Sequence, residues 1–355
     1  MDRHGRTRAL LIKHYQSYPD MEITDIFKYI HQSSFGCEHL VSSPAAAAEY
    51  IQREAENVGE LLSDKIEELD GDYCRVHLGI LKSGISAETL GRLFFLSAKE
   101  EETGVFDVQK KLSAAKELVD EGILPFDGYD FLMACEEWKE RRYPPLHHSD
   151  RFRAGYRPAY RVISRRFVPF LPLFARIDTL LATGNVKLAV EGGSASGKST
   201  LGELLEGVYD CTVFHMDDFF LRPEQRTPER FAEPGGNVDR ERFLKEVLIP
   251  MSQGKEVLYR RFDCSTFTLQ PPVAVKPQQL TVIEGAYSMH PELSGYYDLS
   301  VFLDISPELQ RKRIQKRNSP AMAERFFNEW IPLEQVYHEK LNVKSRCNLV
   351  LNAED

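Results

Sequence analysis

A glycine-rich octapeptide constrains this chain more than any other feature. Residues 192–199 read Gly-Gly-Ser-Ala-Ser-Gly-Lys-Ser and fit the phosphate-loop pattern G-x-x-x-x-G-K-[ST] at every fixed position. The apolar run 186–190 before it predicts a strand, and residues 201–208 after it predict a helix. A glycine-rich turn that binds nothing is the alternative. The strand and helix on either side favour an α/β fold that holds a polyphosphate at a helix N-terminus.

The loop also predicts individual roles. We expect its backbone N–H groups to surround the phosphates of a nucleoside triphosphate, with the Lys198 ammonium on the β and γ oxygens and the Ser199 hydroxyl on Mg²⁺. Lys198 is therefore a predicted catalytic residue. The predicted nucleotide-binding residues are Gly192, Gly193, Ser194, Ala195, Ser196, Gly197, Lys198, Ser199 and Thr200.

Two acidic positions follow predicted strands. Asp217 and Asp218 come after the run 211–216, and Glu284 closes the run 279–283. Open α/β sheets hold ligands at the carboxyl ends of their strands, so we expect these carboxylates near the phosphate loop. One aspartate then accepts the proton of an attacking hydroxyl, and Asp218 and Glu284 join Ser199 around Mg²⁺. The alternatives are a helix-capping aspartate and a solvent-facing strand-end glutamate.

A basic helix is predicted after the run 298–305. Arg313 and Arg317 are four residues apart and Lys316 is one turn from Arg313, so one face carries several cations and could close over a triphosphate. A solvated charged face is the alternative. The cations are Arg311, Lys312, Arg313, Lys316 and Arg317.

The distribution of apolar residues divides the chain. After residue 185, five short β-branched runs alternate with helix-length connections, which predicts a five-stranded, mainly parallel sheet covered by helices. Before residue 165 the apolar spacing is helical, as in Ile23, Ile26, Phe27 and Ile30 and again in Leu61, Leu62, Ile66 and Leu69. We therefore predict a helical domain of five to seven short helices without a sizeable sheet over residues 1–165, and a P-loop domain over residues 166–355.

Composition excludes several classes of protein. The 355 residues carry 45 Lys and Arg against 54 Asp and Glu, a net charge of −9, which disfavours a nucleic-acid-coating protein. The six cysteines form no C-x-x-C pair and are typical of free thiols in a reducing compartment. No apolar stretch is long enough to cross a membrane, so we expect a cytoplasmic protein. Its oligomeric state is left open.

The first half offers two weaker features. Cys37, His39, His147 and His148 do not have a recognised metal-ligand spacing, so we interpret them as core or surface residues. The stretch 141–166 holds eight arginines and one carboxylate, and we expect a helix opened by Pro158. We prefer salt bridges to the acidic helical domain over a phosphate-binding surface. The arginines are Arg141, Arg142, Arg151, Arg153, Arg157, Arg161, Arg165 and Arg166.

The order of motifs over residues 185–352 resembles a known family. GGSASGKST, MDDFF, EPGGNVDRERF, YRRFDC, VIEGAYSMHP and RKRIQKRN are similar to the uridine kinase branch of the P-loop small-molecule kinases, whose relatives include pantothenate kinase and phosphoribulokinase. The first half resembles only uncharacterised bacterial proteins.

This resemblance implies further roles. Asp217 becomes the general base, and Asp239, Asp263 and Tyr287 join it around the acceptor. The predicted basic helix becomes a lid whose cations contact the triphosphate. In this lid Arg313 and Arg317 are catalytic residues and Lys316 is a nucleotide-binding residue.

The expected activity is ATP- and Mg²⁺-dependent transfer of a γ-phosphoryl group to a small-molecule hydroxyl, with uridine or cytidine as the leading acceptor. The chain departs from the nucleoside kinase pattern at Phe267, which stands roughly where a base-recognising histidine is expected. The choice between ATP and GTP and the identity of the acceptor therefore stay open. The alternatives are a kinase for a non-nucleoside metabolite and a nucleotide-dependent switch whose helical domain binds a partner.

Overall fold

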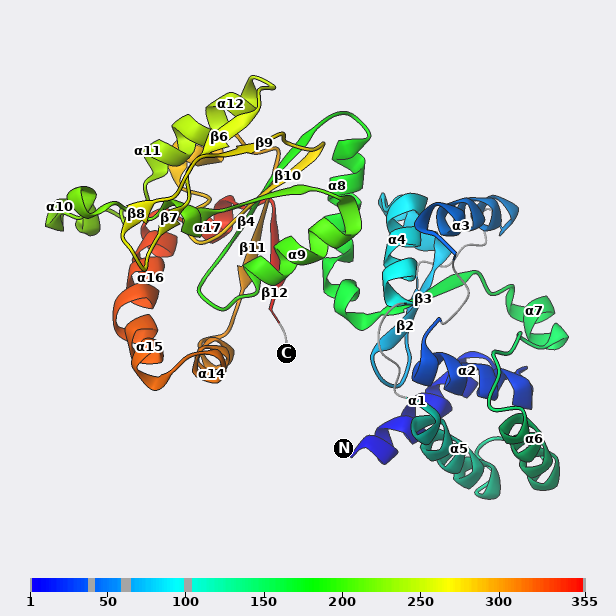
Figure 1. Cartoon of the computed structure of the whole chain (residues 1–355). Coiled ribbons are helices and arrows are strands. Elements are labelled where there is room, and N and C mark those ends of the chain that lie inside the picture. The colour runs from blue at the N-terminus through cyan, green and yellow to red at the C-terminus, as the bar shows by residue number, and fades with distance from the viewer. Residues whose placement is uncertain (1, 38–41, 59–64, 99–103, 354–355) are drawn as a thin grey trace. The chain divides into compact units, whose positions relative to one another are not determined.

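The computed structural model describes residues 2–37, 42–58, 65–98 and 104–353, and its chain divides into two compact units (Figure 1). The units are Met1–Leu171 and Pro172–Asp355. The sequence placed the division at residue 165, shortly before this point.

The N-terminal unit is mostly helical, as predicted, and Figure 1 shows its helices in blue to green. Its elements are α1 (Arg3–Ser17), α2 (Ile23–Phe35), α3 (Pro44–Val58), β1 (Ile66–Glu68), β2 (Tyr73–His77), the 3-10 helix η2 (Leu78–Ser83), α4 (Ala87–Ser97), α5 (Gly104–Asp120), α6 (Gly128–Glu140), α7 (Asp150–Tyr156), β3 (Tyr160–Ser164) and the 3-10 helix η3 (Arg165–Phe170).

A three-stranded antiparallel sheet, β1-β2-β3, corrects the expectation that this unit lacks one. The β1–β2 hairpin turns at Gly71, whose φ of 108° suits glycine, and Asp-Gly is a common hairpin turn sequence. Ile66 therefore lies on a strand and not on the predicted helical face, while Leu61 and Leu62 lie outside the described residues. The helix expected from Pro158 is also wrong, because Val162 and Ile163 are β-branched and pair with β2.

The arginine-rich stretch makes salt bridges inside the N-terminal unit. Arg161 Nη2 lies 2.7 Å from Glu54 Oε2, and Arg165 Nη1 lies 3.2 Å from Glu68 Oε1. The preference for ion pairs over a phosphate-binding surface is therefore confirmed for these two arginines.

The C-terminal unit is built on one parallel sheet with strand order β12-β11-β4-β10-β5. All five predicted strands are present, and two short antiparallel pairs, β6–β9 and β7–β8, lie outside this sheet. The strands are β4 (Val186–Gly192), β5 (Thr212–His215), β6 (Val257–Tyr259), β7 (Phe262–Asp263), β8 (Thr268–Leu269), β9 (Val273–Val275), β10 (Leu280–Glu284), β11 (Leu299–Asp304) and β12 (Leu349–Asn352).

Helices precede and connect these strands, and α9 packs against β4, β5 and β10. They are α8 (Leu171–Leu181), α9 (Lys198–Tyr209), η4 (Met216–Phe219), η5 (Pro223–Gln225), α10 (Pro228–Ala232), α11 (Arg240–Phe243), the π-helix η6 (Leu244–Leu248), α12 (Ile249–Ser252), α13 (Pro291–Ser294), α14 (Pro307–Arg317), α15 (Pro320–Arg325), the π-helix η7 (Phe326–Trp330), α16 (Ile331–Lys340) and α17 (Val343–Arg346).

The register of the sheet brings three sequence motifs to one edge. Glu284 pairs with Val190 on one side and with His215 on the other, so β4, β10 and β5 end at the same level. Buried aromatic residues, among them Phe214 and Phe219, fill the core next to this edge. The phosphate loop, Glu284 and Asp217 therefore leave the sheet from neighbouring strand ends.

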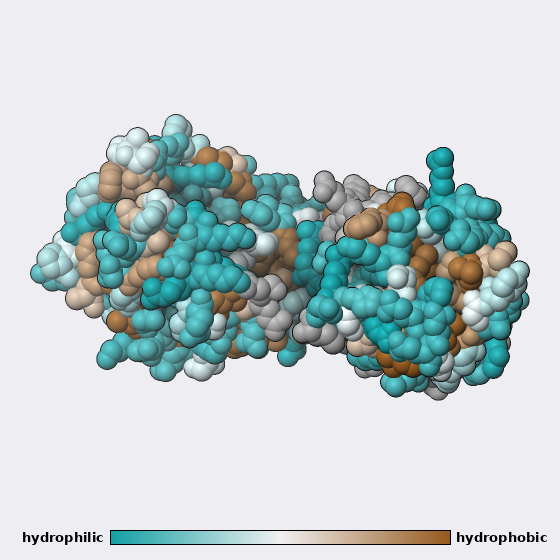
Figure 2. Space-filling model, turned by 90° about the horizontal axis from the view of Figure 1, so that it is seen from below, coloured by the Kyte–Doolittle hydropathy of each residue, from teal (hydrophilic) through white to brown (hydrophobic). Residues whose placement is uncertain are grey.

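The surface is largely hydrophilic on the face shown in Figure 2. Within the described residues, no helix combines the length and the apolar character that a membrane span requires.

Candidate active site

The phosphate loop joins β4 to α9 through backbone conformations that few residue types adopt. Gly192 and Gly197 have φ of 150° and 101°, and Ala195 has φ of 62°. A Cβ atom at Gly192 would lie 2.6 Å from Leu303 O, so glycine is required there on steric grounds. Successive N–H groups in such a loop, followed by a helix N-terminus, form an anion-binding concavity.

Lys198 begins α9 and folds back over the loop. Its Nζ donates hydrogen bonds of 2.9 Å to both Gly192 O and Gly193 O. The ammonium is therefore held at the mouth of the loop by two carbonyl groups. Thr200 follows in the same helical turn and is exposed.

Ser199 and Glu284 form a hydroxyl–carboxylate pair beside the loop. Ser199 Oγ donates to Glu284 Oε1 and Oε2 at 3.2 and 3.3 Å, and His215 Nδ1 lies 2.6 Å from Glu284 Oε1. The hydrogen bond to Glu284 raises the pKa of His215. A serine hydroxyl with one carboxylate is a donor set that suits Mg²⁺, which usually takes few protein ligands besides phosphate and water.

Asp217 and Asp218 lie on η4, immediately after β5, and have different surroundings. Asp217 keeps exposed surface but stands in a recess, where desolvation raises its pKa and the nearby Lys198 ammonium opposes that rise. Burial also raises the pKa of Asp218, and the main opposing charge is Arg261, whose Nε lies 3.4 Å from Asp218 Oδ2. Asp217 thus shares the environment of Lys198, whereas Asp218 pairs with an arginine instead of with Ser199 and Glu284.

The predicted acceptor-binding residues are engaged within the protein. Asp239 is buried, caps α11 and lies 3.4 Å from Arg242 Nε. Asp263 accepts hydrogen bonds from Ser265 N and Oγ at 2.8 and 2.6 Å, which lower its pKa and hold the β7–β8 turn. Tyr287 is buried as well, and the structure does not bring these three side chains into mutual hydrogen-bond contact within its described part.

Of the predicted lid cations on α14, Arg313 contacts the loop. Its Nη1 donates to Ala195 O at 3.3 Å, and Gln310 Nε2 on the same helix donates to Ser194 O at 2.8 Å. Arg317 lies over the Phe326 ring at 5.5 Å, and Lys316 is exposed. The helix therefore approaches the loop through Gln310 and Arg313.

Glu334 on α16 is a site residue that the sequence analysis missed. Its carboxylate accepts hydrogen bonds from Ser194 N at 2.8 Å and Ser194 Oγ at 2.6 Å. Burial raises the pKa of Glu334, and the Lys198 charge opposes this. Glu334 lies in no sequence motif. Only the folded structure shows that its carboxylate accepts hydrogen bonds from groups of the phosphate loop.

Glu191, the residue before the loop, was also missed. It is fully buried and accepts from Met289 N at 3.0 Å and from Tyr337 OH at 3.0 Å. Its position inside an apolar strand was a sequence signal, because a buried carboxylate requires partners. Glu191 thereby ties the loop to α16.

Comparison with known proteins agrees with this geometry. Residues 188–325 match the model of the Phosphoribulokinase / Uridine kinase family. Phosphoribulokinase from Synechocystis sp. is 28% identical over 130 residues, which are 35% of this chain and 39% of that protein. The chain therefore aligns with less than half of the length of this curated relative.

Solved structures of kinases are also similar. A protein described as a possible uridine kinase from Bacillus stearothermophilus is 23% identical, with 50% of this chain and 98% of that chain covered and a TM-score of 0.38. A candidate fructose transport system kinase from Silicibacter sp. TM1040 is 20% identical, with 47% and 89% covered and a TM-score of 0.38. The family match confirms, for this part of the chain, the resemblance to the uridine kinase-like branch of the P-loop kinases that the order of motifs predicted.

Proposed function

We propose that the C-terminal unit transfers the γ-phosphoryl group of ATP to a hydroxyl of a small molecule, with uridine or cytidine as the leading acceptor. One observation carries this proposal: the phosphate loop, the Ser199–Glu284 pair and Asp217 emerge from neighbouring strand ends of one sheet. These are the parts that phosphoryl transfer needs, namely a phosphate cradle, a metal-binding pair and a base.

Each group has a role in this reaction. The loop N–H groups and Lys198 position the triphosphate and offset its negative charge. Ser199 and Glu284 would hold Mg²⁺, which when bound neutralises charge on the phosphate oxygens. Asp217 accepts the proton of the acceptor hydroxyl as the oxygen attacks. A nucleotide-dependent switch needs no such base, so Asp217 is the residue that distinguishes the two functions.

The acceptor class is the finer part of the proposal. The motif order supports a nucleoside, and the name of one structural relative refers to uridine. The curated relative is named for a phosphorylated sugar, which makes a sugar phosphate the second candidate. ATP, Mg²⁺ and six free cysteines are compatible with a reaction in the cytoplasm.

A substrate screen tests the proposal. Purified full-length protein is mixed with ATP and Mg²⁺ and with uridine, cytidine, ribulose 5-phosphate, fructose or pantothenate, and ADP and phosphorylated product are measured. We expect one acceptor class to stimulate ADP release together with product, and Lys198→Ala, checked for folding by circular dichroism, to abolish both. ATP turnover that no acceptor changes, without phosphorylated product, would favour the switch.

A further inference from the structure

The N-terminal unit contains a cavity of about 690 Å³, a volume within the range of small-molecule sites. Residues of α2, α3, α4, β3 and the segment 145–148 line it. Those used below are Lys28, His31, Gln32, Tyr50, Glu54, Phe94, Leu146, His147, His148, Tyr160, Arg161 and Val162.

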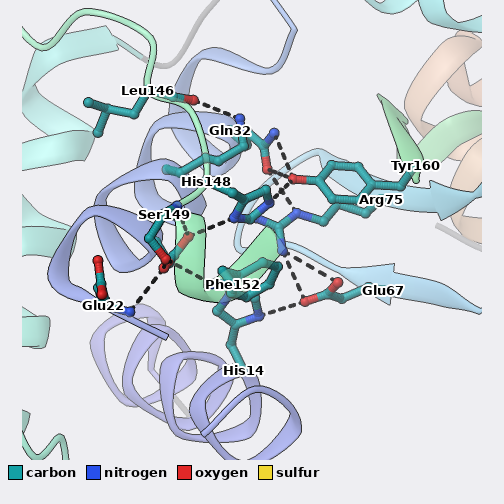
Figure 3. Close-up of polar contacts among 12 residues, drawn as sticks. His14, Glu22, Gln32, Glu67, Arg75, Leu146, His148, Ser149, Phe152 and Tyr160 are labelled. Atoms are coloured by element: carbon teal, nitrogen blue, oxygen red, sulfur yellow. Dashed lines mark hydrogen bonds and ion pairs between the residues drawn. The ribbon is translucent and has the colours of Figure 1, made fainter. Parts of the chain in front are cut away.

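One wall of the cavity is polar and rigidly hydrogen-bonded. His148 Nε2 lies 2.7 Å from Tyr160 OH, Gln32 Nε2 donates to Tyr160 OH at 3.3 Å, and Arg75 Nε donates to Gln32 Oε1 at 2.8 Å (Figure 3). The chain of contacts continues to Glu67, 3.4 Å from Arg75 Nη1. Figure 3 shows these side chains converging from separate elements.

The hydrogen-bonding roles along this wall follow from Asp25. Its buried carboxylate accepts from Ser149 N and Oγ and from His148 Nδ1 at 2.8 Å, and these bonds outweigh burial and lower its pKa. Because Asp25 is an acceptor, His148 carries its proton on Nδ1. Burial lowers the pKa of His148 to about 4, so at neutral pH its unprotonated Nε2 accepts a hydrogen bond from the Tyr160 hydroxyl.

Lys28 supplies positive charge to the cavity. Its Nζ donates to Leu146 O at 2.7 Å, and this is its one hydrogen bond within the part of the chain that the structure describes. An ammonium has three donors, so two are available to a ligand. Among the described lining residues, the one carboxylate is Glu54, which pairs with Arg161 at 2.7 Å. Within the described lining, Lys28 therefore has no carboxylate partner of its own.

The second large cavity of the unit shows the opposite balance. It measures about 760 Å³, and its lining holds the carboxylates of Glu22, Asp127, Asp130 and Glu137 and the guanidinium groups of Arg141 and Arg151. Carboxylates therefore outnumber cations in this lining, which is the reverse of the described lining around Lys28.

We propose that the cavity between α2, α3 and β3 binds a small organic anion, whose charged group meets Lys28 and whose apolar body lies against Phe94, Leu146 and Val162. The hydrogen-bonded wall of Gln32, His148 and Tyr160 orients polar groups of that ligand. This site is separate from the proposed kinase chemistry, since no residue of the phosphate loop lines it.

Two fluorescent probes that differ in charge test the proposal on the full-length protein. 1-Anilinonaphthalene-8-sulfonate combines an apolar ring system with a negatively charged sulfonate, and N-phenyl-1-naphthylamine has the same ring system without the sulfonate. We expect Lys28→Met to weaken sulfonate-probe binding roughly tenfold and to leave neutral-probe binding unchanged, since it removes a charge-assisted hydrogen bond.

Two variants serve as controls. Lys28→Arg keeps the cation and should retain sulfonate-probe binding, while Lys82→Met removes an exposed lysine of the same unit and should affect neither probe. The proposal would be overturned if Lys28→Met weakened the binding of both probes equally or of neither. It would also be overturned if the wild-type chain showed no saturable binding of the sulfonate probe.

A pH titration of the wild-type protein requires no variant. Burial and the Arg75 charge lower the pKa of Lys28 to about 8, and Asp25 opposes them. Sulfonate-probe affinity should therefore fall as pH rises from about 7.5 to about 9.5, while neutral-probe affinity stays constant.

Two lining groups with shifted pKa values keep their charge state over this interval. Burial lowers the pKa of His31 to about 4 and raises the pKa of Tyr160, so both side chains stay neutral between pH 7.5 and 9.5. Glu54 and Arg161 remain an ion pair. A sulfonate-probe affinity that does not change over the interval would contradict the role of Lys28.

Discussion

At the scale of single residues, Asp217 and Asp218 are neighbours with different surroundings. Because desolvation raises the pKa of Asp217 in the free protein, the acid limb of the kcat/KM profile should lie above the ordinary aspartate value of about 3.9. We expect Asp217→Asn to lower kcat by ~10² or more with little change in ATP affinity, and Asp218→Asn to have a milder effect. Steady-state kinetics and calorimetry with ATP check both variants. Equal losses in kcat together with weaker Mg²⁺ binding would assign the pair to metal ligation.

Glu334 offers a second test at this scale. The Glu334 carboxylate accepts hydrogen bonds from Ser194 N and Oγ, close to Lys198. A triphosphate bound in the phosphate loop would be repelled by this carboxylate. Glu334→Gln should therefore strengthen ATP binding by ~5-fold, as expected when on the order of 1 kcal/mol of repulsion is removed. Calorimetry with ATP at fixed Mg²⁺ measures this change, and Glu329→Gln on the neighbouring η7 is a matched control. Weaker ATP binding in Glu334→Gln would show that the carboxylate supports the site.

At the scale of elements, Asp25 joins the first turn of α2 to the segment before α7. The Asp25 carboxylate accepts hydrogen bonds from His148 and Ser149, so Asp25→Asn should lower the free energy of unfolding by ~2–3 kcal/mol at neutral pH. Because the pKa of Asp25 is lower in the folded protein, its ionised carboxylate stabilises the fold at pH values above its unfolded-state pKa of about 3.9. This stabilisation is lost as the pH falls through the folded-state pKa. The difference between wild type and variant should then shrink in acid. Urea unfolding at several pH values tests this, and a constant difference would contradict it.

The elements also show which parts of the fold a sequence pattern reveals. The five parallel strands were predictable because each is a short apolar run that a helix-length connection separates from the next. The N-terminal sheet was not, because β1 has three residues and its apolar positions also fit a helix. Only the Asp70-Gly71 turn indicated a hairpin.

The same limit applies to the site. Lys198 and Ser199 stand in the phosphate-loop motif, so their positions could be predicted from its spacing, whereas the choice of Asp217 over Asp218 came from the family resemblance. Glu334 and Gln310 reach the phosphate loop through the packing of α14 and α16, which no local pattern encodes.

At the scale of the whole molecule, every group assigned to phosphoryl transfer belongs to Pro172–Asp355. A fragment of residues 171–355 keeps α8 intact and should fold and bind ATP with an affinity within about threefold of the full chain, because domains with their own core fold independently. Circular dichroism and calorimetry at millimolar Mg²⁺ measure both properties. A folded fragment without ATP binding would show that the first unit completes the nucleotide site.

The strand order has a consequence for synthesis on the ribosome. The phosphate-loop strand β4 lies between β10 and β11, which begin at Leu280 and Leu299 and are translated long after it. An apolar β4 therefore leaves the exit tunnel before either partner exists, while β3, the last strand of the first unit, is already complete. The first unit can close during translation, but the nucleotide-binding sheet has to wait until most of the chain has emerged. During that interval the backbone groups of β4 lack both partner strands, which leaves the nascent second unit open to non-native strand pairing.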